Sequence, residues 1–166
     1  MAPKPTNKTA RLSAASCWSL IAFGVASLAV SLVALALPGL LIGAALLAHG
    51  LFERIHGKLL FRDANADSAR RLAWNQMGLA ASVSLYLGWQ ASAVDAEELR
   101  AVLLREPVKS ALELYPPEIA QRLVEGLPQY VLGFYGLAMI VALLGCVAMA
   151  ALYLRAGRKL TSASAV

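Results

Sequence analysis

The chain has 166 residues, of which 59% are hydrophobic and only 15% are charged, and its formal net charge is +5. Soluble globular proteins average about 45–50% apolar and about 25% charged residues, so this composition excludes a disordered chain and argues against an ordinary soluble domain. The apolar residues are gathered in uncharged stretches. This pattern predicts an all-α integral membrane protein whose solvent is the lipid bilayer.

The first uncharged stretch predicts two membrane-spanning helices. It holds 41 residues between Arg11 and Glu53, and a single helix of that length would measure about 61 Å, about twice the hydrocarbon core of a membrane. Pro38 removes a helix hydrogen bond and Gly39 accepts unusual backbone angles, so we expect the chain to turn there. The predicted helices cover residues 12–36 and 39–61.

The first of these helices has features of a cleaved signal peptide. A basic opening, an apolar core and the tripeptide Ala34-Leu35-Ala36 imitate its three regions. The apolar stretch, however, is longer than the usual core of about 7–15 residues, and cleavage would leave a short second segment alone. We therefore expect the first helix to be retained as a span.

The second predicted helix contains a charged residue, Glu53, before it is long enough to cross the membrane. Only 14 residues separate Pro38 from Glu53, and they reach about 21 Å, short of a hydrocarbon core of about 30 Å. To cross the membrane, the helix must continue past Glu53, with Arg54 and Lys58 extending toward the interface. A re-entrant or interfacial segment is the alternative, but the charge distribution favours a full span.

Two later uncharged stretches predict two more spans and complete a bundle of four transmembrane helices. They hold 23 residues (72–94) and 29 residues (126–154), and each is long enough to cross with some tilt. The expected organisation is a basic N-terminus (1–11), three spans within 12–94, an exoplasmic connection (95–128), a fourth span (129–154) and a basic tail (155–166).

The distribution of charge predicts the orientation. Two hairpins place the N-terminus, the 53–71 connection and the tail on one side, where 11 basic and 3 acidic residues give a formal charge of +8. The 95–125 stretch on the other side carries 4 basic and 7 acidic residues, and therefore −3. The positive-inside rule then puts both termini in the cytoplasm. The Ala/Leu-rich spans suggest a bacterial cytoplasmic membrane.

The positions of the aromatic residues agree with the predicted spans and their orientation. Trp and Tyr are enriched at both interfaces of a membrane. Trp18, Trp74 and Tyr153 fall near the expected inner ends of spans, and Trp89 and Tyr130 near outer ends. We expect all five to be interfacial belt residues.

The exoplasmic connection predicts short amphipathic helices. Asp95 is a helix cap with Glu98 at the third helical position. Pro107, Pro116-Pro117 and Pro128 divide the following apolar stripes, so two or three short helices are expected. They either cover the ends of the bundle or form a docking surface for a partner.

The polar residues within the apolar stretches form one candidate site. His49, Glu53 and His56 are spaced at i, i+4 and i+7, so a continuous helix places them on one face. Ionisable groups at this depth usually face the bundle interior. Asn75 and Gln76 begin the third span at a similar depth, and either amide is placed to hydrogen-bond to Glu53.

Two interpretations of this cluster remain open. Glu53 either pairs with a histidine or a neighbouring helix and anchors the bundle, or it belongs to an intramembrane polar path. Glu53 and His56 also have the spacing of half a di-iron site, but the other three stretches contain no acid. We therefore predict no metal site in His49, Glu53 and His56, and no cofactor.

Small residues predict close helix packing. Gly39 and Gly43, and separately Ala80, Ser84 and Gly88, recur at fourfold spacing. Such faces allow helices to approach closely, within one chain or between two copies. Cys17 and Cys146 both fall inside spans, where we expect no structural disulfide.

No motif indicates enzymatic chemistry or a nucleic-acid partner. We expect an interaction or accessory component that presents an acidic helical cap outside the cytoplasm to a membrane-protein partner. The alternative is an oligomeric transporter or channel subunit that uses His49 and Glu53 as a polar path. A membrane enzyme or metal carrier that uses His49, Glu53 and His56 is the third class, and the chain offers the fewest of the side chains that such a function needs. The substrate or partner and the oligomeric state are left open.

Overall fold

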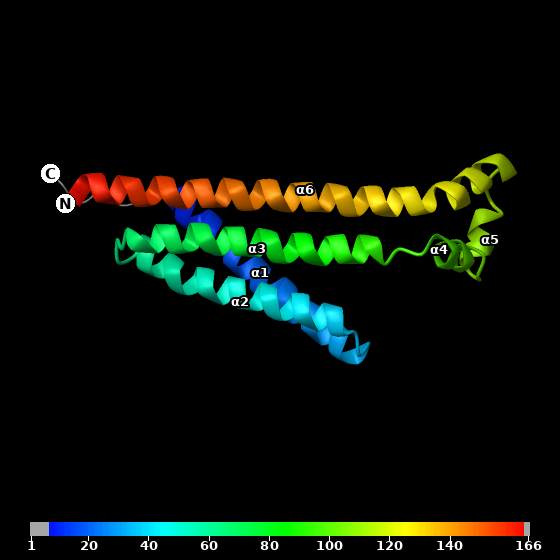
Figure 1. Ribbon diagram of the computed structural model, residues 1–166, viewed down its shortest axis with the longest axis horizontal. Helices are drawn as coiled ribbons and strands as arrows, with labels where there is room; N and C mark the ends of the chain where they lie inside the picture. Colours follow the sequence, from blue (N-terminus) through cyan, green and yellow to red (C-terminus); the bar gives the residue numbers. More distant parts are fainter. Residues whose placement is uncertain (1–6, 165–166) are drawn as a thin grey trace. The chain divides into compact units, whose positions relative to one another are not determined.

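The computed structural model describes residues 7–164, and this part of the chain is helical without strands (Figure 1). The all-α prediction is therefore confirmed. The predicted basic termini fall in part on residues 1–6 and 165–166, which lie outside the described residues. The helices are α1 (Asn7–Val33), α2 (Leu37–Phe61), α3 (Asp67–Ser92), α4 (Ala96–Leu103), α5 (Val108–Leu112) and α6 (Pro117–Ser164).

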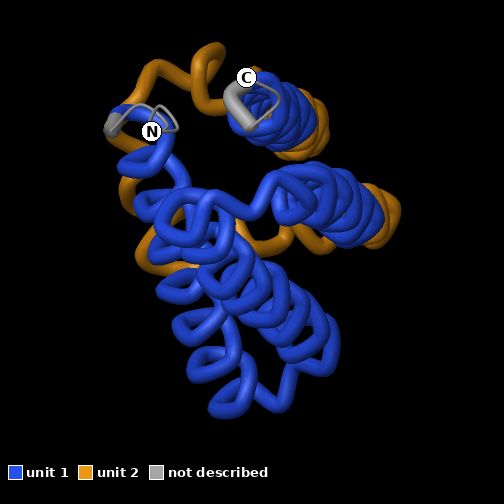
Figure 2. Tube along the Cα trace, turned by 90° about the vertical axis from the view of Figure 1, so that its left-hand side faces the viewer, with its two compact units in different colours: residues 1–86, 142–166 blue, residues 87–141 orange. Residues whose placement is uncertain are grey.

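The chain divides into two compact units (Figure 2). The first comprises residues 1–86 and 142–166, and the second comprises residues 87–141. The first unit contains α1, α2, most of α3 and the end of α6. The candidate site lies wholly within it.

The turn between α1 and α2 lies earlier than predicted. α1 ends at Val33, and Leu35 has a φ of 51°, the left-handed conformation that non-glycine residues rarely adopt. Pro38 lies in the first turn of α2 rather than in the turn between the helices, and Gly39 is helical. The prediction of a break at Pro38 and Gly39 was wrong by a few residues, because the first turn of a helix needs no N–H from proline.

Small residues bring α1 and α2 into close antiparallel contact. A Cβ added at Gly24 would lie 2.8 Å from the backbone nitrogen of Leu47 and 2.9 Å from the carbonyl oxygen of Gly43. A Cβ added at Gly50 would lie 3.1 Å from Cβ of Leu20. In each helix, three buried small residues recur at intervals of seven. They are Cys17, Gly24 and Ser31 in α1, and Gly43, Gly50 and Gly57 in α2.

Two small apolar clusters join α3 to the end of α6. The first is formed by Leu60, Ala69, Leu72, Tyr153, Ala156 and Leu160, all buried. The second is formed by Leu79, Ala80 and Cys146. A Cβ added at Gly157 of α6 would lie 2.6 Å from Cβ of Ala69 in α3, so the two helices also touch through small residues.

The second unit contains the capped short helix that the sequence predicts, directly after the end of α3. The carboxylate of Asp95 accepts hydrogen bonds from the backbone N–H groups of Glu97 (2.8 Å) and Glu98 (3.4 Å) at the start of α4. Pro107 caps α5, as expected from its helix-breaking chemistry. The N-cap at Asp95 and the presence of short helices in this segment are therefore confirmed, whereas its exoplasmic location stays a prediction.

Two short helices occur within residues 95–128, where two or three were expected, because the last apolar stripe does not form a helix of its own. α6 begins at Pro117, includes Pro128 and continues to Ser164, so the helix extends beyond the predicted fourth span (129–154) at both ends. A proline inside a helix removes one backbone hydrogen bond, and the intact turns on both sides maintain the helix. The apolar stripe before Pro128 belongs to α6 itself.

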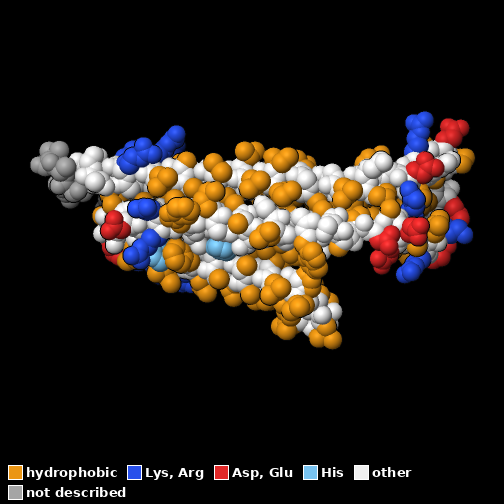
Figure 3. Space-filling view, viewed as in Figure 1, with side chains coloured by type: hydrophobic (Ala, Val, Ile, Leu, Met, Phe, Trp, Pro, Cys, Tyr) orange, Lys and Arg blue, Asp and Glu red, His pale blue; other side chains and the backbone are white. Residues whose placement is uncertain are grey.

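Three of the described helices are long and apolar enough to cross a membrane: α1, α2 and α6. In each, only 17% of the most apolar stretch is buried, and large side chains such as Phe23, Leu41 and Phe134 are exposed. Figure 3 shows apolar side chains spread along the helices. α3 has sufficient length but is less apolar, so the fourth span stays a prediction.

Candidate functional site

The candidate site is a buried carboxylate that joins four helices. Glu53 of α2 is 0% exposed. Its Oε2 accepts hydrogen bonds from the hydroxyl of Ser16 in α1 (3.1 Å) and from the side-chain amide of Gln76 in α3 (3.2 Å). Its Oε1 accepts a hydrogen bond from the hydroxyl of Tyr153 in α6. One side chain therefore contacts every long helix of the first unit.

A further hydroxyl extends this network. The oxygens of Tyr153 and Ser13 are 3.0 Å apart. A phenol has a single proton, so Tyr153 cannot donate to both Glu53 and Ser13. When Tyr153 donates to Glu53, its contact with Ser13 requires the hydroxyl of Ser13 to be the donor. Ser13 and Tyr153 are themselves buried, at 4% and 0% exposure. The network thus places donors on both carboxylate oxygens, the arrangement that makes a buried carboxylate tolerable.

His49 forms a separate connection between α2 and α3. Its Nδ1 lies 2.8 Å from Oδ1 of Asn75, and the amide nitrogen of Asn75 donates to the backbone carbonyl of His49 (3.2 Å). Because Oδ1 of Asn75 can only accept, Nδ1 of His49 is the donor in this pair. Gly78 leaves room for the ring, because a Cβ there would lie 3.1 Å from Cε1 of His49.

His56 does not join either group. Its ring stacks on Phe52, with centroids 3.9 Å apart, and its Nδ1 lies 3.1 Å from the carbonyl oxygen of Phe52. No group of three or more His, Cys, Asp or Glu side chains that could hold a metal occurs within residues 7–164. The structure therefore does not combine His49, Glu53 and His56 into one set of ligands.

The sequence identified part of this site and missed the rest. Of the two amides proposed for Glu53, Gln76 binds it and Asn75 binds His49 instead. Tyr153 was expected in the interfacial belt, but it is fully buried and faces Glu53. Nothing in the local sequence distinguishes a belt tyrosine from a buried one. Ser13 and Ser16 were missed because serine is common throughout α1.

The predicted packing residues have different outcomes. Gly43 closely approaches α1, since an added Cβ would lie 3.0 Å from the backbone nitrogen of Leu28. Ala80 is buried in the second apolar cluster. Ser84 has a buried hydroxyl without a hydrogen-bond partner among the described residues. At Gly88 an added Cβ would meet nothing within 4 Å, so the structure shows no close helix contact there.

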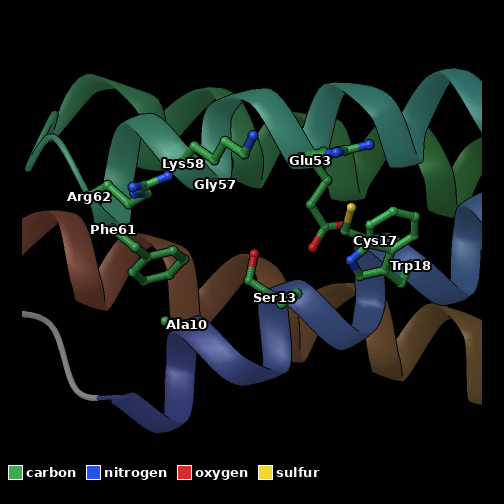
Figure 4. A pocket seen from close by; sticks show the side chains of 11 residues that line it. Ala10, Ser13, Cys17, Trp18, Glu53, Gly57, Lys58, Phe61 and Arg62 are labelled. Atoms are coloured by element: carbon green, nitrogen blue, oxygen red, sulfur yellow. The ribbon is translucent and has the colours of Figure 1, made fainter.

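Beside Glu53, α1 and α2 enclose a groove of about 350 Å³ (Figure 4). Its walls carry Ser13 and Cys17 from α1. Three basic side chains also line it, those of Arg54 and Lys58 from α2 and of the α2 C-cap residue Arg62. The guanidinium of Arg54 lies over the ring of Trp18, 4.9 Å from its centroid. Both cysteines of the chain are free and buried.

Comparison of the chain with protein-family models, with curated proteins and with solved structures finds no match.

Proposed function

We propose that the chain is a multi-pass protein of the bacterial cytoplasmic membrane in which α1, α2, α3 and α6 all cross the bilayer. Of these four helices, α3 is the one that is not apolar enough by composition to cross, because Asn75 and Gln76 lower its hydropathy. Both amides are hydrogen-bonded to α2, so neither would face lipid unpaired. Exposed positions of α3 carry Trp74, Met77 and Leu85, which suit a lipid environment.

The charge distribution supports an orientation with both termini in the cytoplasm. The 53–71 segment, from the end of α2 to the start of α3, carries five basic residues against three acidic ones. The 95–125 segment carries seven acidic residues against four basic ones. Under the positive-inside rule, the basic segments stay in the cytoplasm. The 95–125 segment then faces the opposite side.

In this orientation the protein acts as an interaction component rather than an enzyme. The observation that supports this role is the exposure of large apolar side chains in the acidic second unit: 61% for Leu104, 86% for Leu114 and 45% for Val102. Exposed apolar groups within a charged surface are typical of protein–protein contacts. The complementary partner has an apolar groove rimmed by basic residues.

The membrane surface is a less suitable occupant of this face. Interfacial helices usually carry Lys and Arg that are attracted to anionic lipids. The 95–125 segment instead has a net negative charge. Anionic headgroups would repel it, so a protein partner with basic side chains fits better.

Site-specific photocrosslinking tests this proposal. A photoreactive residue at position 104 or 114, introduced into the full chain in the cells that produce it, is expected to give one adduct of defined mass with another protein. The same residue at position 63, in the basic connection, serves as the control and should not give that adduct. Adducts at 104 and 114 with lipid alone, or with a second copy alone, would contradict the proposed role.

A further inference from the structure

The groove between α1 and α2 combines an apolar floor with a row of cations. Apolar side chains from both helices line it, with Trp18 and Phe61 toward opposite ends and Ser13 between them in Figure 4. Ala10 and Ala14 lie on the α1 side, where their small side chains leave space. A volume of about 350 Å³ lies within the range of small-molecule sites, which is about 300–1,000 Å³.

The cations lie on one side of this groove. Arg54 and Lys58 of α2 and the C-cap residue Arg62 are spaced at i, i+4 and i+8, and all three line the groove and are exposed. Like charges at this spacing repel one another. Among the described residues, none of the three forms an ion pair with an acidic side chain. Their positive charge is therefore available to an anion.

Glu53 also lines the groove but forms no ion pair with these cations among the described residues. Both of its carboxylate oxygens accept hydrogen bonds from α1, α3 and α6, and the side chain is 0% exposed. The ring of Trp18 further orients Arg54 through a cation–π contact. The groove thus presents organised cations above an apolar surface.

We propose that this groove binds an anionic glycerophospholipid of the cytoplasmic leaflet. The phosphate group is held by Arg54, Lys58 and Arg62, and the beginning of one acyl chain lies along Trp18 and Phe61. Basic side chains near the end of a membrane-spanning helix extend to the headgroup level, where lipid phosphates lie. A lipid can contact the basic side chains with its phosphate and the apolar surface with its acyl chain, whereas a free phosphate contacts only the basic side chains.

Native mass spectrometry of the full chain in detergent tests this inference. Phosphatidylglycerol, phosphatidylcholine with the same acyl chains, and inorganic phosphate are titrated separately. We expect retention of one phosphatidylglycerol at a concentration at least about tenfold lower than for phosphatidylcholine, because phosphate contacts to cations are charge-assisted. Inorganic phosphate is expected to compete weakly.

Matched variants localise the binding. The triple variant Arg54→Gln, Lys58→Gln, Arg62→Gln is expected to abolish the preference for phosphatidylglycerol. Arg155→Gln, Arg158→Gln, Lys159→Gln removes the same charge from exposed positions of α6 and should retain it. Ala14→Phe fills the groove without changing its charge and is expected to weaken binding of phosphatidylglycerol at least about fivefold. Circular dichroism checks that each variant keeps its helix content.

Three results would overturn the proposal. An equal loss in the two triple variants would indicate general surface electrostatics. Equal retention of phosphatidylcholine would indicate an apolar groove without headgroup recognition, and full competition by inorganic phosphate would indicate a site for phosphate alone. The inference depends on the proposed insertion of α1 and α2 in the membrane but not on the partner of the second unit, so failure of the crosslinking experiment leaves it unaffected.

Discussion

Glu53 can be buried because its hydrogen-bond donors come from other helices. Ser16 and Gln76 donate to one carboxylate oxygen and Tyr153 to the other. An isolated buried carboxylate is strongly unfavourable, and removal of one donor leaves part of that penalty uncompensated. Glu53 therefore favours an arrangement in which α1, α2, α3 and α6 come together.

Removal of the tyrosine hydroxyl tests this network. Tyr153→Phe retains the ring in the apolar cluster but deletes the O–H donor, and we expect a loss of about 1–3 kcal/mol in the free energy of unfolding. Tyr130→Phe makes the same change at an exposed position of α6 and should alter stability by less than about 0.5 kcal/mol. Unfolding in mixed detergent measures both. Equal effects of the two variants would show that the hydroxyl of Tyr153 contributes nothing specific.

A flux measurement separates the structural interpretation of Glu53 from a role in transport. Its carboxylate is fully buried and its oxygens already accept hydrogen bonds, so we expect proteoliposomes to show no proton or ion flux above protein-free liposomes. Glu53→Gln and His49→Ala should weaken assembly without altering that baseline. Flux through the unmodified protein that either substitution abolishes would instead favour the transporter.

The residues of the site differ in how well the sequence predicts them. Glu53, Gln76 and His49 stand out because ionisable and amide side chains are rare in apolar stretches. Tyr153 does not, because tyrosine is common at membrane interfaces and its burial depends on packing against α3. Pairing between helices follows from tertiary structure, so the sequence could not assign Asn75 to His49.

Among the helices, the α1–α2 hairpin depends most on small residues. Gly24, Gly43 and Gly50 each lie so close to the facing helix that an added Cβ would meet its atoms at 3.0 Å or less. Small residues allow such approach, which gains dispersion and short polar contacts within a membrane. The sequence indicates this face through Gly39 and Gly43, but the seven-residue repeat emerges only when α1 and α2 are compared.

An alanine substitution measures the importance of this approach. In Gly24→Ala the new Cβ would lie 2.8 Å from the backbone of α2, where no side chain can move aside, so we expect a loss of about 1–3 kcal/mol in unfolding free energy. Gly145→Ala is the control, since its Cβ would meet nothing within 4 Å, and alanine there should be neutral or stabilising by up to about 1 kcal/mol. Wild-type stability of Gly24→Ala would contradict the close packing.

The start of α4 can be tested independently of the membrane. Asp95→Ala removes the acceptor for the N–H groups of Glu97 and Glu98, and an N-cap of this kind stabilises a helix by about 1 kcal/mol. Hydrogen exchange at these two amides should become several-fold faster, while Asp95→Asn should restore protection. If exchange is unchanged in Asp95→Ala, the cap does not hold the helix.

For the whole molecule, the uncharged stretches predict the main helices well. The length and apolarity of a stretch can be read from that stretch alone, without knowledge of tertiary contacts. The predicted 12–36, 39–61 and 72–94 correspond closely to α1, α2 and α3. The extent of α6 was missed since Pro128 was expected to end a helix, whereas it lies inside one. The number of crossings depends on whether the paired amides of α3 enter the bilayer, which composition alone does not decide.

Cysteine labelling tests the four-span arrangement most directly. Single cysteines at positions 65 and 110 are treated with a membrane-impermeant maleimide in intact and permeabilised cells, and the native Cys17 and Cys146 give little background because both are buried. Four spans predict that position 110 is labelled from outside, whereas position 65 is labelled only after permeabilisation. Labelling of both positions from the same side would contradict the arrangement and indicate that α3 does not cross the membrane.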